Sequence, residues 1–175
     1  MAIDESLAFK PVRIALLTVS DTRTLAEDTS GDILAQRIEA AGHELVVREI
    51  SHDDVNEIDA HLHRWIEDES IDCVICTGGT GLTGRDVTPE ALDRVKSKDV
   101  PGFGELFRWL SYETIGTSTI QSRACAVVAR GTYIFALPGS NGAVKDGWDK
   151  ILIHQLDSRY RPCNFVELMP RLRER

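Results

Sequence analysis

A glycine-rich turn between an apolar segment and a helix start constrains the fold of this chain more than any other feature. The apolar residues 74–76 (VIC) lead into residues 77–81 (TGGTG). Three glycines within four residues allow positive φ angles and bring bare N–H groups against a ligand, and the threonines add hydroxyl donors. Pro89 suits the first turn of the next helix, with Thr88 as its expected cap. Because a helix start favours anions, the junction predicts a phosphate site; a tight connection without a ligand is the alternative.

Asp86 follows this turn closely, and its carboxylate would repel a bound phosphate. A cation between the two removes the repulsion, so we interpret Asp86 as a ligand of Mg²⁺, directly or through water. The alternatives are a cap at the helix start and an ion pair with Arg85. The turn lacks the Gly-Lys-Ser/Thr ending of a P-loop and does not open the chain as a G-x-G-x-x-G dinucleotide fingerprint does.

The composition excludes several classes of protein. With 175 residues and 42% hydrophobic content, the chain suits one domain with a sizeable core. A net charge of -8 argues against general binding to nucleic acid or to an anionic membrane. No apolar run approaches the roughly 18 residues of a membrane span, and a start that carries Asp4 and Glu5 does not read as a signal peptide. We therefore expect a cytoplasmic protein.

Apolar segments alternate with helical patterns along the chain, which is typical of a parallel sheet wrapped by helices. Strands are expected at residues 13–19, 45–50, 73–77, 124–129 and 132–137. The last two are separated by Arg130 and Gly131, which predicts a β-hairpin. The expected fold class is α/β, a three-layer α/β/α arrangement in which helices cover both faces of a mostly parallel sheet. Along the chain we expect an N-terminal arm at 1–11, one domain at 12–158 and an extended tail at 159–175, packed on the domain or on a neighbouring subunit.

Cys73 and Cys76 have the C-x-x-C spacing of a metal or redox motif. Residues three apart in a strand point to opposite faces of the sheet, so the two sulfurs diverge. We therefore interpret both cysteines, together with Cys125, as core residues. The sequence leaves the role of Cys163 open.

Ligands of open α/β sheets bind beyond the carboxyl ends of the strands. Three loops have that position: residues 20–24, 77–86 and 138–141. Asp53 ends the second strand, so strand-end placement can bring it close to Asp86. Two glycine-rich loops and two carboxylates at one edge are a stronger signal than either motif alone.

Several residues near these loops keep a second interpretation. Asp53 also suits a helix cap, and Ser140 suits a turn or a helix cap. Asp21 and Arg23 are equally compatible with a plain surface loop. Residues 122–123 either support the hairpin or contact a ligand, and the sequence does not choose between the two.

Five motifs follow one another along the chain: 77–81 (TGGTG), 85–91 (RDVTPEA), 101–108 (PGFGELFR), 116–118 with 121–124 (GTS, QSRA) and 137–140 (LPGS). Together they resemble the MoaB/MogA family of molybdenum cofactor biosynthesis proteins, and the resemblance covers nearly the whole chain. Residues 110–113 (LSYE) and 161–165 (RPCNF) are similar to the MoaB branch in particular.

The resemblance implies a molybdopterin-binding fold that assembles as a homo-oligomer, either a trimer or a hexamer. It also implies that ATP and molybdopterin are converted, in the presence of Mg²⁺, to adenylylated molybdopterin and pyrophosphate. The family's two important aspartates correspond to Asp53 and Asp86, which are the expected catalytic residues and Mg²⁺ ligands. The residues expected to bind ligand or phosphate are Ser20, Asp21, Thr77, Gly78, Gly79, Thr80, Gly81, Pro138, Gly139 and Ser140.

Two other functions remain compatible with the sequence. The first is a molybdopterin-binding or carrier protein of the same pathway that does not turn over its ligand. The second is a CinA-type pyrophosphatase acting on nucleotide diphosphates. Other proteins of the pathway are further expected partners, and the region of Trp109 and Tyr112, with the tail, is the expected subunit interface.

Overall fold

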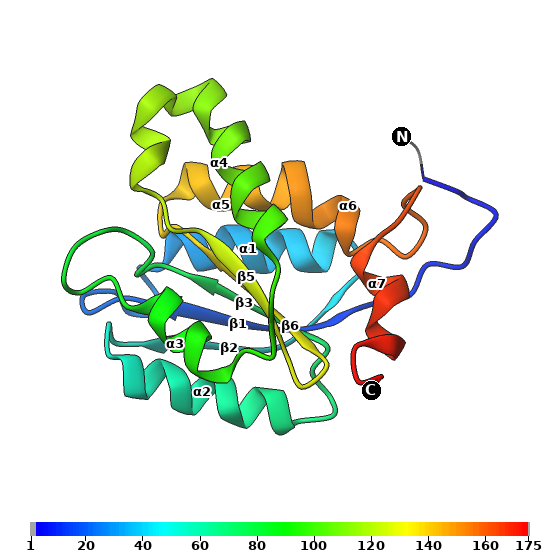
Figure 1. Ribbon diagram of the computed structural model, residues 1–175, viewed down its shortest axis with the longest axis horizontal. Coiled ribbons are helices and arrows are strands. Elements are labelled where there is room, and N and C mark those ends of the chain that lie inside the picture. The colour runs from blue at the N-terminus through cyan, green and yellow to red at the C-terminus, as the bar shows by residue number, and fades with distance from the viewer. Residues whose placement is uncertain (1–2, 175) are drawn as a thin grey trace.

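A computed structural model describes residues 3–174, in which helices cover both faces of a six-stranded sheet (Figure 1). The strands are β1 (Arg13–Val19), β2 (Glu44–Ser51), β3 (Cys73–Thr77), β4 (Lys98–Asp99), β5 (Cys125–Ala129) and β6 (Thr132–Leu137), in the order β2-β1-β3-β6-β5-β4. The first four strands in that order run parallel, whereas β5 is antiparallel to both β6 and β4. The predicted mostly parallel α/β/α fold with its hairpin is confirmed.

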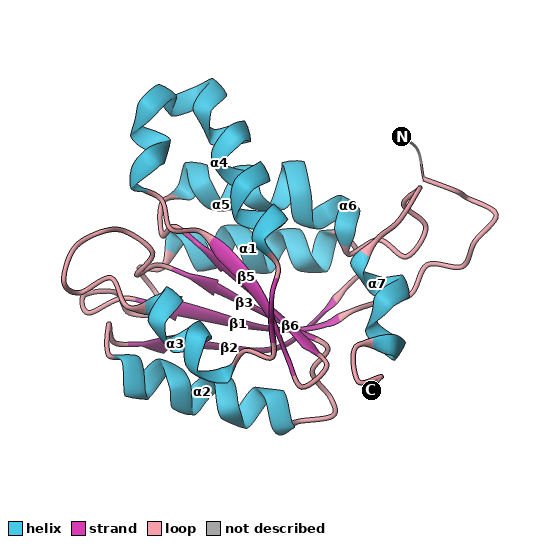
Figure 2. Ribbon diagram, viewed as in Figure 1, coloured by secondary structure: helices cyan, strands magenta, loops and turns pink. Residues whose placement is uncertain are grey.

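The helices form the two outer layers of the molecule. α1 (Thr29–Ala40), α4 (Pro101–Ile115) and α5 (Asn141–Gly147) cover one face, and α2 (Val55–Glu67) and α3 (Thr88–Val95) cover the other (Figure 2). Shorter helical segments are η1 (Gly116–Gln121), η2 (Trp148–Leu152), α6 (Ile153–Gln155), α7 (Phe165–Leu168) and η3 (Met169–Arg171). Within residues 3–174, no helix has the length and apolar character needed to cross a membrane.

Side chains that alternate along the strands build a separate core on each face of the sheet. In β1, Ile14 and Leu16 join the core under α1, α4 and α5, whereas Ala15 and Leu17 join the core under α2 and α3. All four side chains are fully buried. A strand buried on both faces reads as a continuous apolar run, which is why the sequence identifies β1 so clearly.

The cysteines of β3 follow the same alternation. Cys73 belongs to one core and Cys76 to the other, so the prediction that their sulfurs diverge is confirmed. Cys125 is half-buried and packs against the second core, whereas Cys163 is exposed. All four are free thiols.

The helix starts correct one predicted cap. Asp54 begins α2, because its carboxylate accepts hydrogen bonds from the backbone N–H groups of Asn56 and Glu57 at 2.8 and 3.1 Å. The prediction that Thr88 caps α3 is wrong: the N-cap position is Val87, which provides no side-chain cap bond. The Thr88 hydroxyl instead donates to the Gly78 carbonyl at 2.8 Å, because a buried carbonyl needs a donor.

The tail after residue 158 is only partly extended, which corrects the prediction for that segment. Asn164 accepts a hydrogen bond from the Glu167 backbone N–H at 2.9 Å and so begins α7. The Phe165 ring packs 4.7 Å from the Tyr133 ring, so the tail packs on the domain. An N-cap residue followed by apolar side chains favours a short helix despite the neighbouring prolines. Residues 3–10 and α7 lie away from the carboxyl ends of β1 and β3 (Figure 1).

Candidate functional site

The glycine turn after β3 has a backbone that only glycine accommodates at two positions. Gly78 and Gly79 have φ angles of 106° and 61°. A Cβ atom on Gly78 would lie 2.1 Å from the Val19 carbonyl oxygen, and one on Gly79 would lie 2.5 Å from the Thr88 hydroxyl. The turn therefore depends on glycine both for its conformation and for its close approach to β1 and α3.

The loop after β6 packs directly on this turn. The Gly78 N–H donates to the Leu137 carbonyl at 2.9 Å, and the Thr77 hydroxyl donates to the Pro138 carbonyl at 3.2 Å. A Cβ atom on Gly139 would lie 3.2 Å from the Gly78 Cα atom. Thr77 is fully buried and joins the two loops, so its hydroxyl does not face a cavity.

Arg123 supports the far side of the glycine turn. Its Nε donates to the Gly81 carbonyl at 2.7 Å, and its Nη2 donates to the Asp86 carbonyl at 2.6 Å. The guanidinium also forms an ion pair with Glu90, and the backbone N–H donates to Thr80. These contacts give Arg123 a role that differs from both roles considered for residues 122–123: it supports the glycine turn rather than the hairpin or a ligand.

Two cavities adjoin the turn. The acidic cavity, about 420 Å³, lies beyond β1, β2 and β3 and is lined by Val19, Ser20, Asp21, Thr22, Arg23, Asp53, Gly78, Gly79, Thr83, Arg85, Asp86, Gly139 and Ser140. The apolar cavity, about 480 Å³, lies between α4, η1 and α5, and its lining includes Thr80, Gly81, Phe107, Ile115, Pro138, Ser140, Gly142 and Ala143. Every predicted site residue except Thr77 lines one of them, and Ser140 lines both.

Asp21 and Asp53 hold the first two loops of the acidic cavity together. The Asp21 N–H donates to Asp53 Oδ2 at 3.2 Å, and the Asp53 N–H donates to Asp21 Oδ1 at 3.0 Å. The alternative that Asp53 caps the following helix is wrong, since Asp54 does so. The Asp53 carboxylate therefore lines the acidic cavity beside Gly79.

Asp86 is held by its own loop. Its Oδ2 accepts hydrogen bonds from the Thr83 N–H at 2.8 Å and the Thr83 hydroxyl at 2.7 Å. Neither alternative for this residue is observed: α3 begins after Val87, and Arg85 approaches Asp21 at 3.7 Å instead. Asp86 thus lines the cavity as a preorganised carboxylate.

The pKa values of Asp53 and Asp86 move in opposite directions. Burial raises the pKa of Asp53, and the nearby charges of Asp21 and Asp86 raise it further. Burial also acts to raise the pKa of Asp86, but the hydrogen bonds from Thr83 outweigh it, and the net pKa is lowered. Negative charge is therefore concentrated around Asp53, where a cation would relieve it.

The carboxylates fit a metal that arrives with a phosphate ligand. Among residues 3–174, no three His, Cys, Asp or Glu side chains are arranged to hold a metal ion by themselves. Mg²⁺ usually binds to proteins through one or two carboxylates and completes its shell with water and substrate phosphates. Asp53 and Asp86 on one cavity wall match this pattern, whereas a site made wholly of protein ligands does not.

Ser140 has a structural role that is compatible with ligand contact. Its hydroxyl accepts a hydrogen bond from the Ala143 N–H at 3.2 Å and so begins α5, as the cap interpretation proposed. The neighbouring Asn141 accepts a hydrogen bond from the Thr29 hydroxyl at 3.0 Å, which ties α5 to α1. A hydroxyl that accepts in a cap can still donate its hydrogen, and that of Ser140 lies where both cavities meet.

Some residues of the cavities had no clear signal in the sequence. Phe107 belongs to the apolar stripe of α4 and is a core residue, yet it also lines the apolar cavity. Thr83 and Arg85 lie in the loop at residues 77–86, which the sequence indicates as part of the site, but their contacts depend on the path of that loop. Arg23 was an equal candidate for a plain surface position, and it lines the acidic cavity.

Comparisons with known proteins agree with this geometry. The family described as "Probable molybdopterin binding domain" matches residues 15–158. "Molybdenum cofactor biosynthesis protein B" of Escherichia coli (strain K12) is 49% identical over 160 residues, covering 91% of this chain and 94% of that protein. A crystal structure of a molybdenum cofactor biosynthesis protein B superimposes with a TM-score of 0.86 at 36% identity, covering 97% of this chain and 100% of that one.

A second solved structure extends the comparison. The "tungsten cofactor synthesizing protein MoaB from Pyrococcus furiosus" superimposes with a TM-score of 0.78 at 33% identity, covering 95% of this chain and 100% of that one. The family match spans the glycine turn, both aspartates and the loop after β6. The chain therefore belongs to the MoaB/MogA family of molybdopterin-binding, molybdenum cofactor biosynthesis proteins.

Proposed function

We propose that this protein acts in molybdenum cofactor biosynthesis, where it binds molybdopterin and adenylylates it with Mg·ATP, releasing pyrophosphate. The observation that carries the proposal is the glycine turn between an acidic and an apolar cavity that meet at Ser140. Both substrates join a flat heterocycle to phosphate, and the two cavities offer surfaces for both parts. The names of the relatives, which refer to molybdenum and tungsten cofactor synthesis, support the same pathway.

The residues of the site suit nucleotidyl transfer. A phosphate oxygen of molybdopterin attacks the α-phosphorus of ATP, a new P–O bond forms, and the bond to pyrophosphate breaks. Because the nucleophile is supplied by the substrate, the protein needs no serine or cysteine nucleophile and mainly positions the reacting groups. The N–H groups of Gly79 and Thr80 would bind the phosphate oxygens, because those of Gly78 and Gly81 already donate to the Leu137 carbonyl and the Asp86 carboxylate.

The acidic wall would hold the metal of Mg·ATP. Asp86, fixed by Thr83, and Asp53, whose pKa is raised by burial and by like charges, are the carboxylates that would contact it. When bound, Mg²⁺ offsets phosphate charge and orients phosphate oxygens. Asp53 and Asp86 would then serve to place the nucleotide's phosphates against the turn.

The apolar cavity would take the heterocycle of one substrate. Phe107, Ile115 and Ala143 supply apolar walls, and the Ser140 hydroxyl lies at the border with the phosphate region. Apolar walls with a few polar groups at one edge are typical of sites for flat rings. This cavity would thus fix the distance between the ring and the reacting phosphate.

The test is a direct assay of the transfer. Purified protein is mixed with molybdopterin, Mg·ATP and inorganic pyrophosphatase, and adenylylated molybdopterin is followed by chromatography beside Asp86→Ala. We expect product from the wild type, and a loss of more than roughly 10³-fold in turnover for the variant with molybdopterin binding largely kept. Asp93→Ala is the control, because Asp93 is an exposed α3 residue paired with Lys96 outside both cavities.

Each other outcome has a distinct meaning. Bound molybdopterin without product from the wild type would favour a carrier protein of the pathway. Hydrolysis of ADP-ribose would favour a pyrophosphatase of the CinA type. Loss of molybdopterin binding in Asp86→Ala would move this residue from catalysis to recognition.

We further propose that the protein works as a homo-oligomer, a trimer or a hexamer. Trp109 and Tyr112 on α4 are 70% and 57% exposed, and the end of α4 projects beyond the body of the domain (Figure 1). Exposed aromatic side chains on such a projection suit a subunit interface. Light scattering of Trp109→Glu and Tyr112→Glu should show a smaller particle, and an unchanged mass would exclude this region as the interface.

A further inference from the structure

The acidic cavity has an unbalanced charge for a site that binds phosphate. Three carboxylates line it, those of Asp21, Asp53 and Asp86, beside two guanidinium groups, those of Arg23 and Arg85. The Arg85 side chain is 79% exposed and its contact with Asp21 is long, at 3.7 Å. The Arg23 side chain is 34% exposed and has several fixed contacts. Arg23 is therefore the better organised cation of this cavity.

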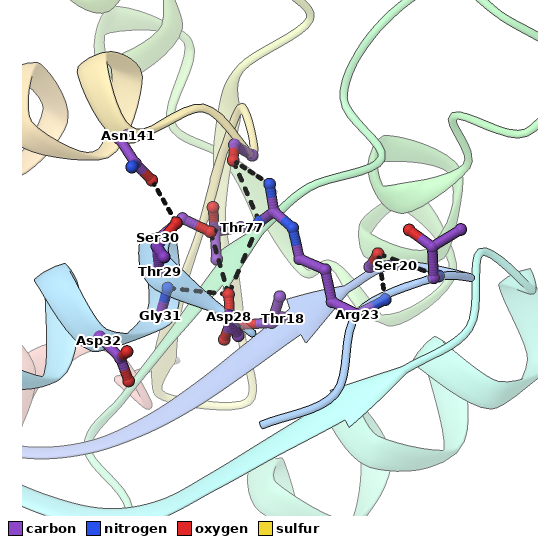
Figure 3. Close-up of polar contacts among 12 residues, drawn as sticks. Thr18, Ser20, Arg23, Asp28, Thr29, Ser30, Gly31, Asp32, Thr77 and Asn141 are labelled. Atoms are coloured by element: carbon purple, nitrogen blue, oxygen red, sulfur yellow. Dashed lines mark hydrogen bonds and ion pairs between the residues drawn. The ribbon is translucent and has the colours of Figure 1, made fainter. Parts of the chain in front are cut away.

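The guanidinium of Arg23 bridges the first turn of α1 and the loop after β6 at the cavity wall. Its Nη1 donates to the Ser30 hydroxyl at 2.6 Å, and both Nη atoms lie 3.3 Å from the Gly139 carbonyl oxygen (Figure 3). Its backbone N–H donates to the Ser20 hydroxyl at 3.2 Å. These contacts hold the positive charge beside Gly78 and Gly139, where the glycine turn meets the loop after β6.

A buried carboxylate lies behind these contacts. Asp28 is fully buried, and its Oδ1 accepts a hydrogen bond from the Ser30 hydroxyl at 3.1 Å and lies 3.6 Å from Arg23 Nη1 (Figure 3). Since the Ser30 hydrogen points to Asp28, the lone pairs of its oxygen are left for Arg23. The carboxylate thereby fixes the direction from which Ser30 binds Arg23.

Asp28 is itself locked in place by groups outside the cavity. Its Oδ2 accepts hydrogen bonds from the Thr18 hydroxyl at 2.6 Å and from Arg48 Nη2 at 2.9 Å, and its Oδ1 accepts one from the Gly31 N–H at 3.0 Å. A Cβ atom on Gly31 would lie 2.0 Å from Asp28 Oδ2, so the start of α1 leaves room only for this carboxylate. A buried charge with this many partners is a rigid anchor.

We propose that Asp28, acting through the Ser30 hydroxyl, is a positioning residue that holds Arg23 as the cation for the phosphate chain of the nucleotide in the acidic cavity. The class of ligand rests on the proposed function, whereas the arrangement of Asp28, Ser30 and Arg23 does not. Arg23 is the residue that touches the ligand, and Asp28 acts only through it. A guanidinium suits this task because its planar donors can bind a phosphate while others keep their protein contacts.

The network also explains how charges of opposite sign coexist in the cavity. Arg23 is on the side of Gly139, whereas Asp53 and Asp86 are on the side of Thr83 and Gly79. A phosphate chain on the glycine turn would then have the guanidinium on one side and the metal-binding carboxylates on the other. Preorganised charges of this kind bind more strongly than mobile ones, since no side-chain freedom is lost on binding.

The experiment is calorimetry with Mg·ATP and, separately, with inorganic pyrophosphate. We expect Arg23→Gln to weaken binding of both by about 10- to 100-fold, and Arg23→Lys to recover part of that loss. Asp28→Asn should weaken binding by about tenfold, and Ser30→Ala by at least as much, because Asp28 acts through the Ser30 hydroxyl. Arg37→Gln is the charge-matched control, because Arg37 pairs with Asp149 away from the cavity; its affinities should match the wild type.

A double-mutant cycle separates positioning from a general effect on the fold. If Asp28 acts through Arg23, Asp28→Asn causes no further loss of affinity in the Arg23→Gln background. Additive losses would overturn the proposal. Should Asp28→Asn fail to fold, the same cycle with Ser30→Ala decides, because that change keeps the Asp28–Arg48 pair.

The outcomes also distinguish this inference from the proposed function. Equal affinities for wild type and the Arg23 variants, with clear binding by both, would overturn the role of Arg23 and leave the adenylyltransferase proposal standing. A wild type that binds neither Mg·ATP nor pyrophosphate would overturn both proposals. Matching losses of pyrophosphate and ATP affinity would support the assignment of Arg23 to the phosphate chain.

Discussion

The acidic and apolar cavities share a border at Ser140 but differ in what holds their walls. The acidic cavity is walled by loops whose shape depends on hydrogen bonds between side chain and backbone, such as those of Asp21 and Asp53. The apolar cavity is walled mainly by helical residues, including Phe107 and Ala143, and by the η1 segment. A phosphate needs backbone N–H groups and fixed charges, which loops present, whereas a ring needs mainly shape. Under the proposed function, the chemistry would therefore depend on the loops and ring binding on the helices.

The two regions also differ in electrostatic repulsion. The acidic cavity keeps like charges together. Burial raises the pKa of Asp53, and the charges of Asp21 and Asp86 raise it further. The apolar cavity has no comparable repulsion among its apolar lining residues. A site that concentrates charge for a cation is expected to be less stable without that cation.

The largest loss of ligand binding in both cavities is expected from altering the glycine turn that adjoins them. Gly79→Ala places a Cβ atom at a φ of 61°, 2.5 Å from the Thr88 hydroxyl and 3.0 Å from Asp53 Oδ1. Strain of this kind costs about 1–3 kcal/mol, and the turn must move away from its phosphate-binding shape. We expect a lower unfolding midpoint in calorimetry and no measurable binding of Mg·ATP or molybdopterin.

Gly84→Ala provides the matched control for this change. A Cβ atom on Gly84 meets nothing within 4 Å, and Gly84 has no positive φ. Its stability and ligand affinities should therefore be close to those of the wild type. If Gly79→Ala and Gly84→Ala bind ligands equally well, the turn is not the phosphate site.

A smaller effect is expected from filling the apolar cavity alone. Gly142 lines that cavity in α5, and a Cβ atom there meets nothing within 4 Å, so a leucine at this position begins in open space and occupies part of the cavity. The leucine should weaken binding of the ring-containing ligand by about 10- to 100-fold, because even small misfits in a pocket are costly. Calorimetry should show pyrophosphate binding unchanged.

Gly102→Leu is the matched control for Gly142→Leu. Gly102 lies in the first turn of α4, is exposed, and also leaves a Cβ atom in open space. It lies outside the lining of the apolar cavity. A loss of ring-ligand affinity in Gly102→Leu as large as that in Gly142→Leu would show that the effect does not come from filling the cavity.

Much of the fold could be predicted because its signals are local. The strands β1, β3 and β6 are continuous apolar runs, and the positive φ angles of Gly78 and Gly79 confirm the turn expected from their spacing. The two-residue strand β4 escaped prediction, because Lys98 and Asp99 are polar and exposed and carry no strand pattern. Its pairing with β5 is a product of tertiary structure.

The candidate site was less predictable where function depends on long-range contacts. The strand-end rule indicated Asp53 and Asp86 as neighbours, and both line the acidic cavity. The support of Arg23 by Asp28 requires the start of α1 to fold back against β1, and no spacing in the sequence specifies that. The same reason explains the wrong cap prediction for Thr88. A cap rule considers only neighbouring residues, whereas the Thr88 hydroxyl donates to the carbonyl of Gly78, ten residues earlier in the chain.

Asp53→Asn gives the smallest expected effect and the finest test of the difference between the two cavities. Without metal, the pKa of Asp53 lies above its ordinary value of 3.8, because of burial and the charges of Asp21 and Asp86. Between the ordinary and the raised pKa the folded protein binds more protons than the unfolded chain, so stability falls as pH rises through the folded pKa. At pH 7 the carboxylate therefore costs stability, and the amide should raise the unfolding midpoint by about 1–2 °C. The difference should shrink at pH values below the ordinary pKa, where both states are protonated.

Mg·ATP should reverse the order of stability of the two proteins by stabilising the wild type more than Asp53→Asn. A variant that is less stable than the wild type at pH 7 without metal would show that Asp53 serves the fold more than the site.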